Sequence, residues 1–351
     1  MKLSSFFAGA ALAAVVAPAS LSAATISGAD ALREWNLIVF NDLNSSSEVE
    51  GRTFVGGNLN GNSSNYRTRT LADSVYGTPG LTVVGNVTGN AKNLNNGAGA
   101  SVGGNVANPF NLNGPNQTIN IGGTYRLQNI NGNTANVGLN MPGATYNAGF
   151  LSGLVGQRDT LSTSLTGLSA ELAARPATDP GIFRLNGNRA TFTATESFNV
   201  VNLDGSIFSS IREIDFQNSG TTIVNVSGAS LLLDDNFVGN ASQLGGNVLW
   251  NFFEATDLTF TTAFRGSVLA PLASAHTRNM IEGTAVFSSL RQDGKIALGT
   301  FNGAIPALPA PPTAEMPVPE PATWAMLLLG FGFIGLILRR RRGTTFSQVS
   351  A

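Results

Sequence analysis

Ser101-Val102-Gly103-Gly104-Asn105 is the stretch that decides the fold. Related stretches, each with apolar residues leading into glycine, are Phe54-Val55-Gly56-Gly57-Asn58, Val83-Val84-Gly85-Asn86 and Ile119-Asn120-Ile121-Gly122-Gly123. Their anchor residues Val55, Val84, Val102 and Ile121 lie 29, 18 and 19 residues apart. The pattern returns after a gap, with anchors 23, 24, 20 and 18 residues apart at Val201, Val224, Val248, Val268 and Val286.

Recurrence near 18–24 residues is typical of a β-solenoid, in which each coil lays short strands on the coils above and below. Inward apolar residues would stack in a column, while glycine and asparagine would take the corners. The sequence therefore predicts a mainly β chain folded as a right-handed β-helix. A β-sandwich, which also has closely spaced strands, is the alternative.

One segment breaks the β pattern. Leucines at positions 154, 161, 165, 168 and 172 fall mostly at helical spacing, which predicts an amphipathic helix from about Val155 to Ala174 along one flank of the solenoid. A shorter helix is expected to begin at Ser27, as its cap, and to end near Asn36. Residues 37–40 then read as a buried strand.

The N-terminus has the features of a secretory signal peptide. Lys2 precedes an apolar stretch from Leu3 to Ala17 and a small-residue site, so residues 1–24 should form a signal helix that signal peptidase removes after Ala23 or Ala24. The exported body would then cover residues 25–304, which is ample for a hydrophobic core.

The C-terminus carries a three-part signal. Pro319-Glu320-Pro321 is followed by Trp324-Ala325, an uncharged run from Ala322 to Leu338, and Arg339-Arg340-Arg341-Arg342. A 17-residue helix of this kind just reaches across a thin membrane core, and the arginines would hold its end in the cytoplasm. Residues 305–317 read as a proline-rich linker and 343–351 as a cytoplasmic tail.

This arrangement resembles the PEP-CTERM sorting domain of bacterial exported proteins, over residues 318–342. The resemblance implies recognition by a membrane exosortase, cleavage near Pro319-Glu320-Pro321, and delivery to the cell surface or exopolysaccharide matrix. The membrane helix would then be a processing signal, and it is also the better explanation for the G-x-G-x-x-G spelling at 330–335.

Composition narrows the function classes. The 351 residues include 41 glycines and no cysteine, which excludes thiolate chemistry, and only 12% are charged. Loss of Lys2 and Arg339 to Arg342 would leave 15 basic against 21 acidic residues. That balance argues against nucleic acid as a partner.

Each candidate catalytic or metal-binding residue also has a structural or solvent-exposed interpretation without chemistry. Gly99-Ala100-Ser101-Val102-Gly103 spells the nucleophile motif G-x-S-x-G, but no helix is expected after it. His276 is the single histidine and is expected at a solenoid corner in a structural role. Glu213 and Asp215 would share one strand face, as a glycoside-cleaving pair or as solvated acids. Asp234-Asp235-Asn236 offers oxygens for calcium without a known loop pattern. The sequence therefore predicts no catalytic residue, no cofactor and no metal site.

The body resembles the choice-of-anchor A domain of bacterial surface proteins, through Ala31 to Asn58 and through Asn247-Val248-Leu249-Trp250, Phe264 to Pro271 and Ile281 to Thr284. This resemblance implies an adhesin-like β-solenoid without established catalysis. Residues 247–298 are also similar in layout to bacterial ice-binding β-solenoids, which pack a long helix beside the coils. An ice-binding face needs ranks of threonine, and the candidates Thr191-Phe192-Thr193-Ala194-Thr195 and Thr259-Phe260-Thr261 are only two patches.

We therefore expect an exported surface or matrix protein that works by binding or adhesion, with extracellular polysaccharide or surface proteins as partners. A polysaccharide lyase or hydrolase is the alternative from another class, and ice binding is a lesser one.

Overall fold

The structure is a computed structural model that describes residues 26–126, 130–218, 220–239, 241, 244–307 and 321–341. The chain divides into two compact units, Met1–Ile305 and Pro306–Ala351. The first unit, here called the head, contains all the described strands together with α1 (Gly28–Glu34) and α2 (Phe150–Ala173). The second contains α3 (Pro321–Arg341). The predicted signal peptide and its cleavage site lie outside the described residues.

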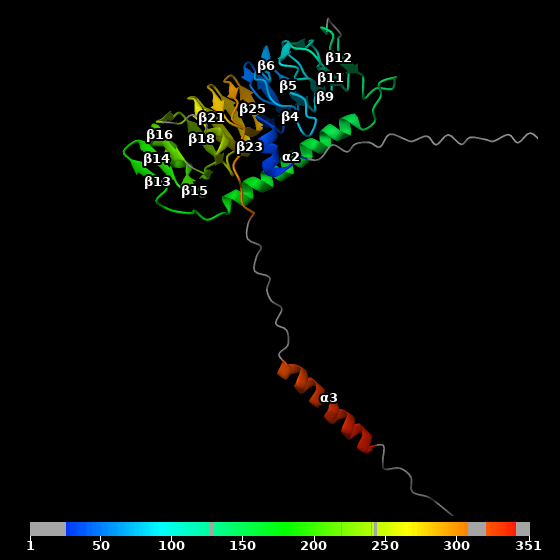
Figure 1. Cartoon of the computed structure of the whole chain (residues 1–351), viewed down its shortest axis with the longest axis vertical. Helices are drawn as coiled ribbons and strands as arrows, with labels where there is room; N and C mark the ends of the chain where they lie inside the picture. The colour runs from blue at the N-terminus through cyan, green and yellow to red at the C-terminus, as the bar shows by residue number, and fades with distance from the viewer. Residues whose placement is uncertain are drawn as a thin grey trace, which may run out of the picture. The chain divides into compact units, whose positions relative to one another are not determined.

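The head is a parallel β-solenoid, as predicted (Figure 1). Its largest sheet runs in the order β12 (Thr134–Val137), β11 (Thr118–Ile121), β9 (Ala100–Val102), β7 (Leu81–Val83), β4 (Thr53–Val55), β1 (Leu37–Val39), β25 (Ala285–Gln292), β23 (Ser267–Thr277), β20 (Val248–Asn251), β17 (Thr221–Ser227) and β15 (Phe198–Asp204). Four further strands join it through the long strands β23 and β25: β2 (Leu43–Ser45), β5 (Leu59–Asn60), β18 (Ser230–Leu233) and β21 (Asp257–Phe260).

Two smaller sheets form the remaining side of the coils. One contains β10 (Asn111–Leu112), β8 (Lys92–Leu94), β6 (Ser64–Tyr66), β3 (Glu48–Val49), β26 (Ile296–Ala297), β24 (Ile281–Glu282) and β22 (Phe264–Arg265). The other contains β13 (Phe183–Asn186), β14 (Arg189–Ala194), β16 (Glu213–Asn218) and β19 (Asn236–Val238). Short 3-10 helices occur at Gly205–Ser209 and Leu244–Gly246. Among the described strands only the β13–β14 pair is antiparallel, so a sandwich is excluded.

The coils are not stacked in chain order. The first strand, β1, pairs on one side with β4 and on the other with β25, near the end of the head. The N-terminal half therefore stacks outward from the middle to β12, and the C-terminal half starts at the opposite end with β15 and stacks back to β25. Figure 1 shows the two halves meeting where blue strands lie beside orange ones. We call the β1–β25 contact the seam.

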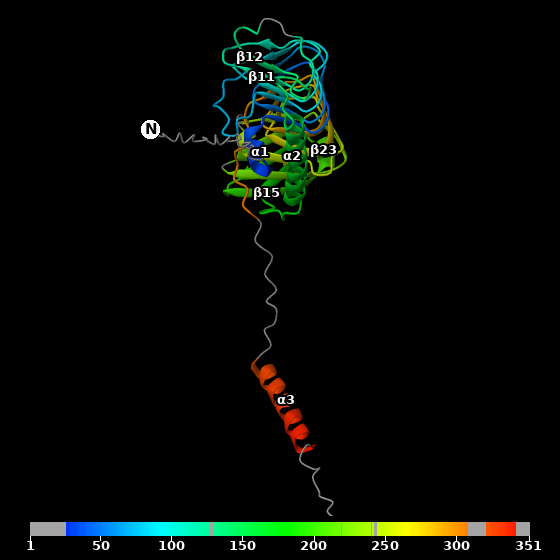
Figure 2. The same cartoon turned by 90° about the vertical axis from the view of Figure 1, so that its right-hand side faces the viewer.

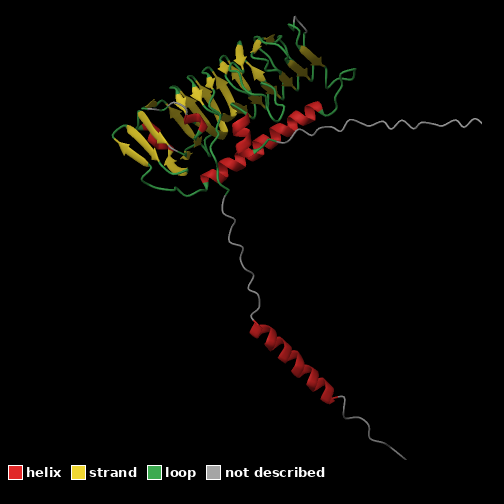
Figure 3. Cartoon of the chain, viewed as in Figure 1, coloured by secondary structure: helices red, strands yellow, loops and turns green. Residues whose placement is uncertain are grey.

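Helix α2 lies on the connection between the two far ends. Its 24 residues extend about 36 Å at 1.5 Å per residue, which covers roughly seven of the ten strand-to-strand steps in the largest sheet at about 4.8 Å each. It packs on α1, β17, β20 and β23, along one flank of the head (Figures 2 and 3). The helix prediction is confirmed, with a start about five residues earlier than expected.

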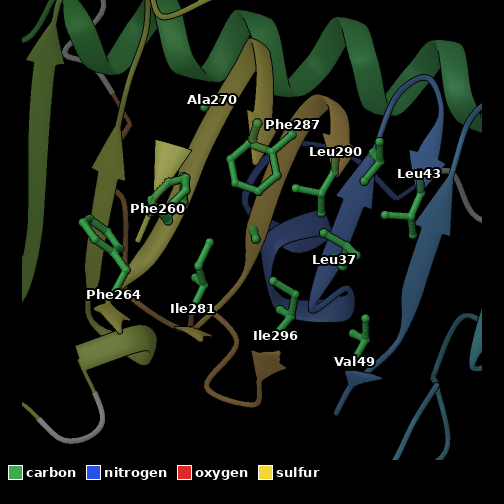
Figure 4. Packing of buried hydrophobic residues seen from close by; sticks show 14 of the residues in the cluster. Leu37, Leu43, Val49, Phe260, Phe264, Ala270, Ile281, Phe287, Leu290 and Ile296 are labelled. Carbon is green, nitrogen blue, oxygen red and sulfur yellow. The ribbon is translucent and has the colours of Figure 1, made fainter. Parts of the chain in front are cut away.

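Two apolar clusters hold the head together. One fills the solenoid interior, as Figure 4 shows for Leu37, Leu43, Val49, Phe260, Phe287 and Ile296. The other lies between the largest sheet and the helices, and includes Ile38, Leu161, Leu165 and Leu172. Because side chains alternate along a strand, Leu37 and Val39 join the inner cluster while Ile38 joins the helix cluster. These strands are therefore buried on both faces.

The predicted anchors do lie on stacked strands, but several of them are shifted by one or two residues from the positions that pair. Val55 pairs with Val83, Val83 with Val102, and Val102 with Ile121. Val84, the predicted anchor, instead belongs to the helix cluster. In the second series Val224 pairs with Trp250 rather than Val248, and Val268 pairs with Ala285 rather than Val286. A one-residue slip exchanges the inner and outer faces, which is why the spacing alone misplaced Val84 and Val286.

The glycine corners have a steric cause. A Cβ added to Gly103 would lie 2.1 Å from the Val84 carbonyl oxygen, and one added to Gly122 would lie 2.1 Å from the Gly103 oxygen. Neighbouring coils approach too closely at this corner for any side chain. Glycine is therefore required here by contact between coils.

The terminal elements correct or limit several predictions. Helix α1 ends at Glu34, and Ser27 at its N-cap makes no side-chain capping bond. Of the sorting-signal residues, Pro321, Trp324, Ala325 and Arg339 to Arg341 lie in α3, whereas Pro319, Glu320 and Arg342 lie outside the described residues. In the part of the chain that is described, no helix reaches the length and hydropathy of a membrane span. Membrane crossing by residues 322–338 therefore stays a prediction.

Candidate functional site: a bare polar face

The head has three sides, and one of them is formed by strands whose outward residues are polar apart from Leu232. This bare face consists of β18, β21, the second halves of β23 and β25, and then β2 and β5. Isolated bridges continue it through Val87, Val106 and Tyr125. Its inward residues are buried apolar side chains: Leu231, Leu258, Ala275, Leu290, Leu43, Leu59, Val87, Val106 and Tyr125.

The outward residues form two ranks along the solenoid axis, one on each side of the buried column. The first rank is Ser230, Asp257, Ser274, Ser289, Asp42, Asn58, Asn86, Asn105 and Thr124. The second includes Leu232, Thr259, His276, Arg291, Asn44 and Asn60. Because the pairing is continuous, neighbouring members of a rank lie about 4.8 Å apart. The face is thus a regular, nearly flat polar surface that crosses the seam.

Half of the first rank is a hydrogen-bonded ladder. The backbone N–H of Asn58 donates to Asp42 Oδ1 at 2.7 Å, and that of Asn86 donates to Asn58 Oδ1 at 2.9 Å. Asn105 and Thr124 repeat the contact on the preceding asparagine at 2.8 Å each. The asparagines that follow the corner glycines therefore fix the spacing between coils and leave a rigid amide surface.

A shallow depression of about 390 Å³ lies across the seam on this face. Polar side chains from both halves of the chain line it: Asp42, Asn44, Asn60, Asp257, Thr259, Ser274, His276, Ser289 and Arg291. It is open to solvent and has hydrogen-bond donors and acceptors on its floor. Such a surface suits a polymer that lies along it.

His276 lies within strand β23 and not at a corner as predicted, and its side chain is hydrogen-bonded. Its Nε2 is 2.8 Å from Asp293 Oδ2, which also accepts from Arg291 Nε at 3.2 Å. The hydrogen bond from His276, with further help from Ser46 and Arg291, lowers the pKa of the Asp293 carboxyl although burial opposes this. The three residues form a hydrogen-bonded cluster at the edge of the depression.

The predicted threonine patches do not form an ice-binding rank. Thr191 and Thr193 lie on β14, in the four-stranded sheet, whereas Thr259 lies on β21 of the bare face. Thr259 is flanked in register by Leu232 and His276, and Thr191 by Asp215. Threonine is therefore not repeated from coil to coil at either place.

The residues considered for catalysis are separated or paired with structural partners. Ser101 lies in the middle of β9 between Thr82 and Asn120, not in a strand-to-helix turn. Glu213 and Asp215 do share one face of β16, but Arg189 lies 3.8 Å from the first and 2.9 Å from the second. These two carboxylates are accounted for by an ion pair.

Among the described residues no group of three or more acidic or histidine side chains could hold a metal ion. Asp235, one of the calcium candidates, is only 3% exposed, and neither of its carboxyl oxygens has a hydrogen-bond partner. Burial raises the pKa of Asp235 to about 7, with a further contribution from Asp234 that Arg212 partly offsets.

A second amide ladder, which the sequence did not reveal, holds α2 on the sheet. Asn251 Nδ2 donates to Asn225 Oδ1 at 2.9 Å, and Asn225 Nδ2 donates to Asn202 Oδ1 at 2.8 Å. Asn225 also donates to the Leu172 carbonyl at 2.7 Å, and Ser169 Oγ donates to Asn251 Oδ1 at 2.6 Å. One asparagine per coil after an apolar pair was visible in the sequence, but the helix partner was not.

Two protein-family models match this chain, one over the head and one over the C-terminal segment. Residues 28–298 match the family model described as "Putative Ice-binding-like adhesive domain", and residues 317–342 match the PEP-CTERM protein-sorting motif. No curated protein matches.

Two solved structures are similar to the chain. An ice-binding protein from the Antarctic ascomycete Antarctomyces psychrotrophicus has 13% identity and a TM-score of 0.27, covering 78% of this chain and 98% of that one. An ice-binding protein of Shewanella frigidimarina has 12% identity and a TM-score of 0.29, covering 76% and 96%. The parallel strand pairing within the head is what identifies the solenoid. The family match spans most of the chain, and the chain therefore belongs to the ice-binding-like adhesive domain family, whose members are not enzymes, and carries a PEP-CTERM motif that implies export and processing by exosortase.

Proposed function

We propose that the head is an adhesin whose bare face binds extracellular polysaccharide or the surface of a neighbouring protein. The observation that carries this proposal is the pair of polar ranks that run unbroken across the seam. Amide, hydroxyl and carboxylate groups at a regular spacing can hydrogen-bond a polymer with repeated hydroxyls. Each such contact adds only about 1 kcal/mol, so useful affinity would come from many coils acting together.

The way the chain leaves the head supports this choice of face. The Gly28 N–H lies 3.2 Å from Ser164 Oγ of α2, and Arg33 Nη2 lies 3.2 Å from the Gly303 carbonyl. Ala304 N donates to Thr221 Oγ1 on β17 at 3.1 Å. Both described ends of the head are thus held on the helix side. The last described residues of the head therefore lie on a side other than the bare face.

The remaining features of this proposal come from the sequence. Signal peptidase would cut after Ala23 or Ala24, residues 305–317 would act as a linker, and exosortase would cut near Pro319-Glu320-Pro321. The head would then be released from the membrane into the cell surface or exopolysaccharide matrix. We also propose that the head is a choice-of-anchor A domain and that its coils are right-handed.

A glycan array and a pull-down of the organism's exopolysaccharide with purified head, residues 25–305, test the binding role. Asn44→Tyr and Thr259→Tyr place bulky rings on the bare face. Among the described residues, the side chains of Asn44 and Thr259 make no hydrogen bond, so these changes should not disturb the fold. Asn65→Tyr makes the matched change on the seven-stranded sheet. We expect the first two to reduce binding at least tenfold and the control to leave it unchanged.

Equal binding by all three variants would refute the assignment to this face. Release of reducing sugar that depends on Glu213 or Asp215 would instead favour the enzyme alternative, and thermal hysteresis of the wild-type head would favour ice binding.

A further inference from the structure

The two ends of the solenoid are finished differently. At the β15 end, Thr178 caps the edge strand: its N–H donates to the Val200 carbonyl at 3.0 Å, and its Oγ1 accepts from the Val200 N–H at 3.1 Å. The other edge strand at this end, β13, carries the exposed charged side chain of Arg184. Charge and capping are the usual means by which proteins prevent edge pairing.

At the opposite end, strand β12 is the terminal member of the largest sheet (Figure 1). The Thr134 N–H donates inward to the Gln117 carbonyl. Since amide groups alternate in direction along a strand, the N–H groups of Ala135 and Val137 point away from the sheet. In the described residues the one cap on this edge is Thr145 Oγ1, which donates to the Val137 carbonyl at 2.7 Å.

This end carries little charge. The sequence from 127 to 157 contains no charged residue, and the exposed Arg126 lies just before it in the connection from β11 to β12. Ile130, Ala135 and Val137 pack against the end of the inner core and are themselves only partly buried. Met141, Tyr146 and Leu151 lie in the segment that leads from β12 into α2 and are 43%, 55% and 40% exposed. The end therefore combines an unpaired strand edge with sparsely charged, partly apolar surroundings.

We propose that two copies of the head associate end to end through β12. Two identical edges related by a twofold axis pair antiparallel, so each copy supplies the same outward N–H and C=O groups. An end with so little charge brings little like-charge repulsion when it meets its own copy, which favours self-association over a charged partner. Because a twofold pairing uses the β12 edge of both copies, the association closes at two copies and does not continue into a fibre.

Sedimentation velocity and light scattering of the purified head, residues 25–305, over a hundredfold concentration range test this proposal. Ala135→Pro removes an outward N–H, and proline is tolerated on an edge strand when that side faces solvent. Thr134→Lys places a charge on the same edge through an exposed side chain. Asn186→Lys adds the same charge at the capped end, as the matched control.

The wild-type head and Asn186→Lys should show twice the monomer mass at high concentration. Ala135→Pro and Thr134→Lys should weaken the association at least tenfold while the melting temperature of the monomer changes little. If Ala135→Pro does not fold, Thr134→Lys alone decides. A wild-type head that stays monomeric throughout, or a Thr134→Lys head that dimerises as the wild type does, overturns the proposal.

Discussion

Replacing Asp235 by asparagine should stabilise the head at alkaline pH and much less at acidic pH. Asp235 follows β18 at a corner, is 3% exposed, and has no hydrogen-bond partner for either carboxyl oxygen. Burial and the nearby Asp234 raise its pKa from 3.8 to about 7. The folded head therefore prefers the protonated form of this side chain.

The sign and size follow from linkage. Between pH 4 and 7 the unfolded chain has released the proton that the folded head still holds, so the free energy of unfolding falls as pH rises through this range. Each pKa unit corresponds to about 1.4 kcal/mol, so the loss attributable to Asp235 between pH 5 and pH 8 is about 3 kcal/mol. Below pH 4 both states bind the proton and the contribution disappears.

Urea denaturation of wild type and Asp235→Asn at pH 5 and pH 8 measures this difference, because comparison of the two proteins cancels all other titrations. Asparagine does not ionise, so its advantage over aspartate should be about 3 kcal/mol larger at pH 8. Asp204→Asn is the control without pH dependence: hydrogen bonds from Ser206 lower the pKa of that exposed acid, so it is ionised in the folded and unfolded states at both pH values, and the effect of its substitution should be the same at pH 5 and pH 8. An advantage of Asp235→Asn that is equal at the two pH values would refute the reasoning.

Three further outcomes can be checked with simple variants. In a urea titration, Gly103→Ala should lower the free energy of unfolding by about 2–4 kcal/mol, because its methyl group would collide with the Val84 carbonyl oxygen. Gly153→Ala is the control: this position on α2 has open space around it, so alanine should raise the free energy of unfolding by up to about 1 kcal/mol. Asn225→Leu should cost about 2–3 kcal/mol and speed amide hydrogen exchange in α2, since it breaks the ladder that holds the helix. Replacing residues 319–321 by alanines should leave the sorting segment attached in cells, as the intact mass of the recovered protein would show; unchanged processing would contradict the assigned cleavage region.

Much of the fold could be predicted because the local rules are strict. Apolar residues followed by glycine mark a strand that ends at a corner between coils. At positions such as 103 and 122 an added Cβ would lie about 2 Å from a carbonyl oxygen of the neighbouring coil, so only glycine fits there. The leucine spacing in 154–172 identifies a helix face that must be covered, and these leucines do pack against the largest sheet.

The candidate site could be predicted only in part. Asparagine after the corner glycines signalled turns, and the structure shows that Asn58, Asn86 and Asn105 also form a ladder on one face. His276 and Asp42 could not be placed near one depression from sequence, because they come from opposite halves of the chain. Their proximity depends on the pairing of strands about 240 residues apart.

By itself the sequence determined the repeat, the glycine corners, the flanking helix and the sorting signal, since each is set by neighbours along the chain. Tertiary structure alone decided the order of the coils, the seam between β1 and β25, and which polar ranks meet on the bare face. The physical reason is that every coil offers similar backbone groups above and below. The choice of partner is therefore made by side-chain packing across the head, to which α2 contributes on β17, β20 and β23.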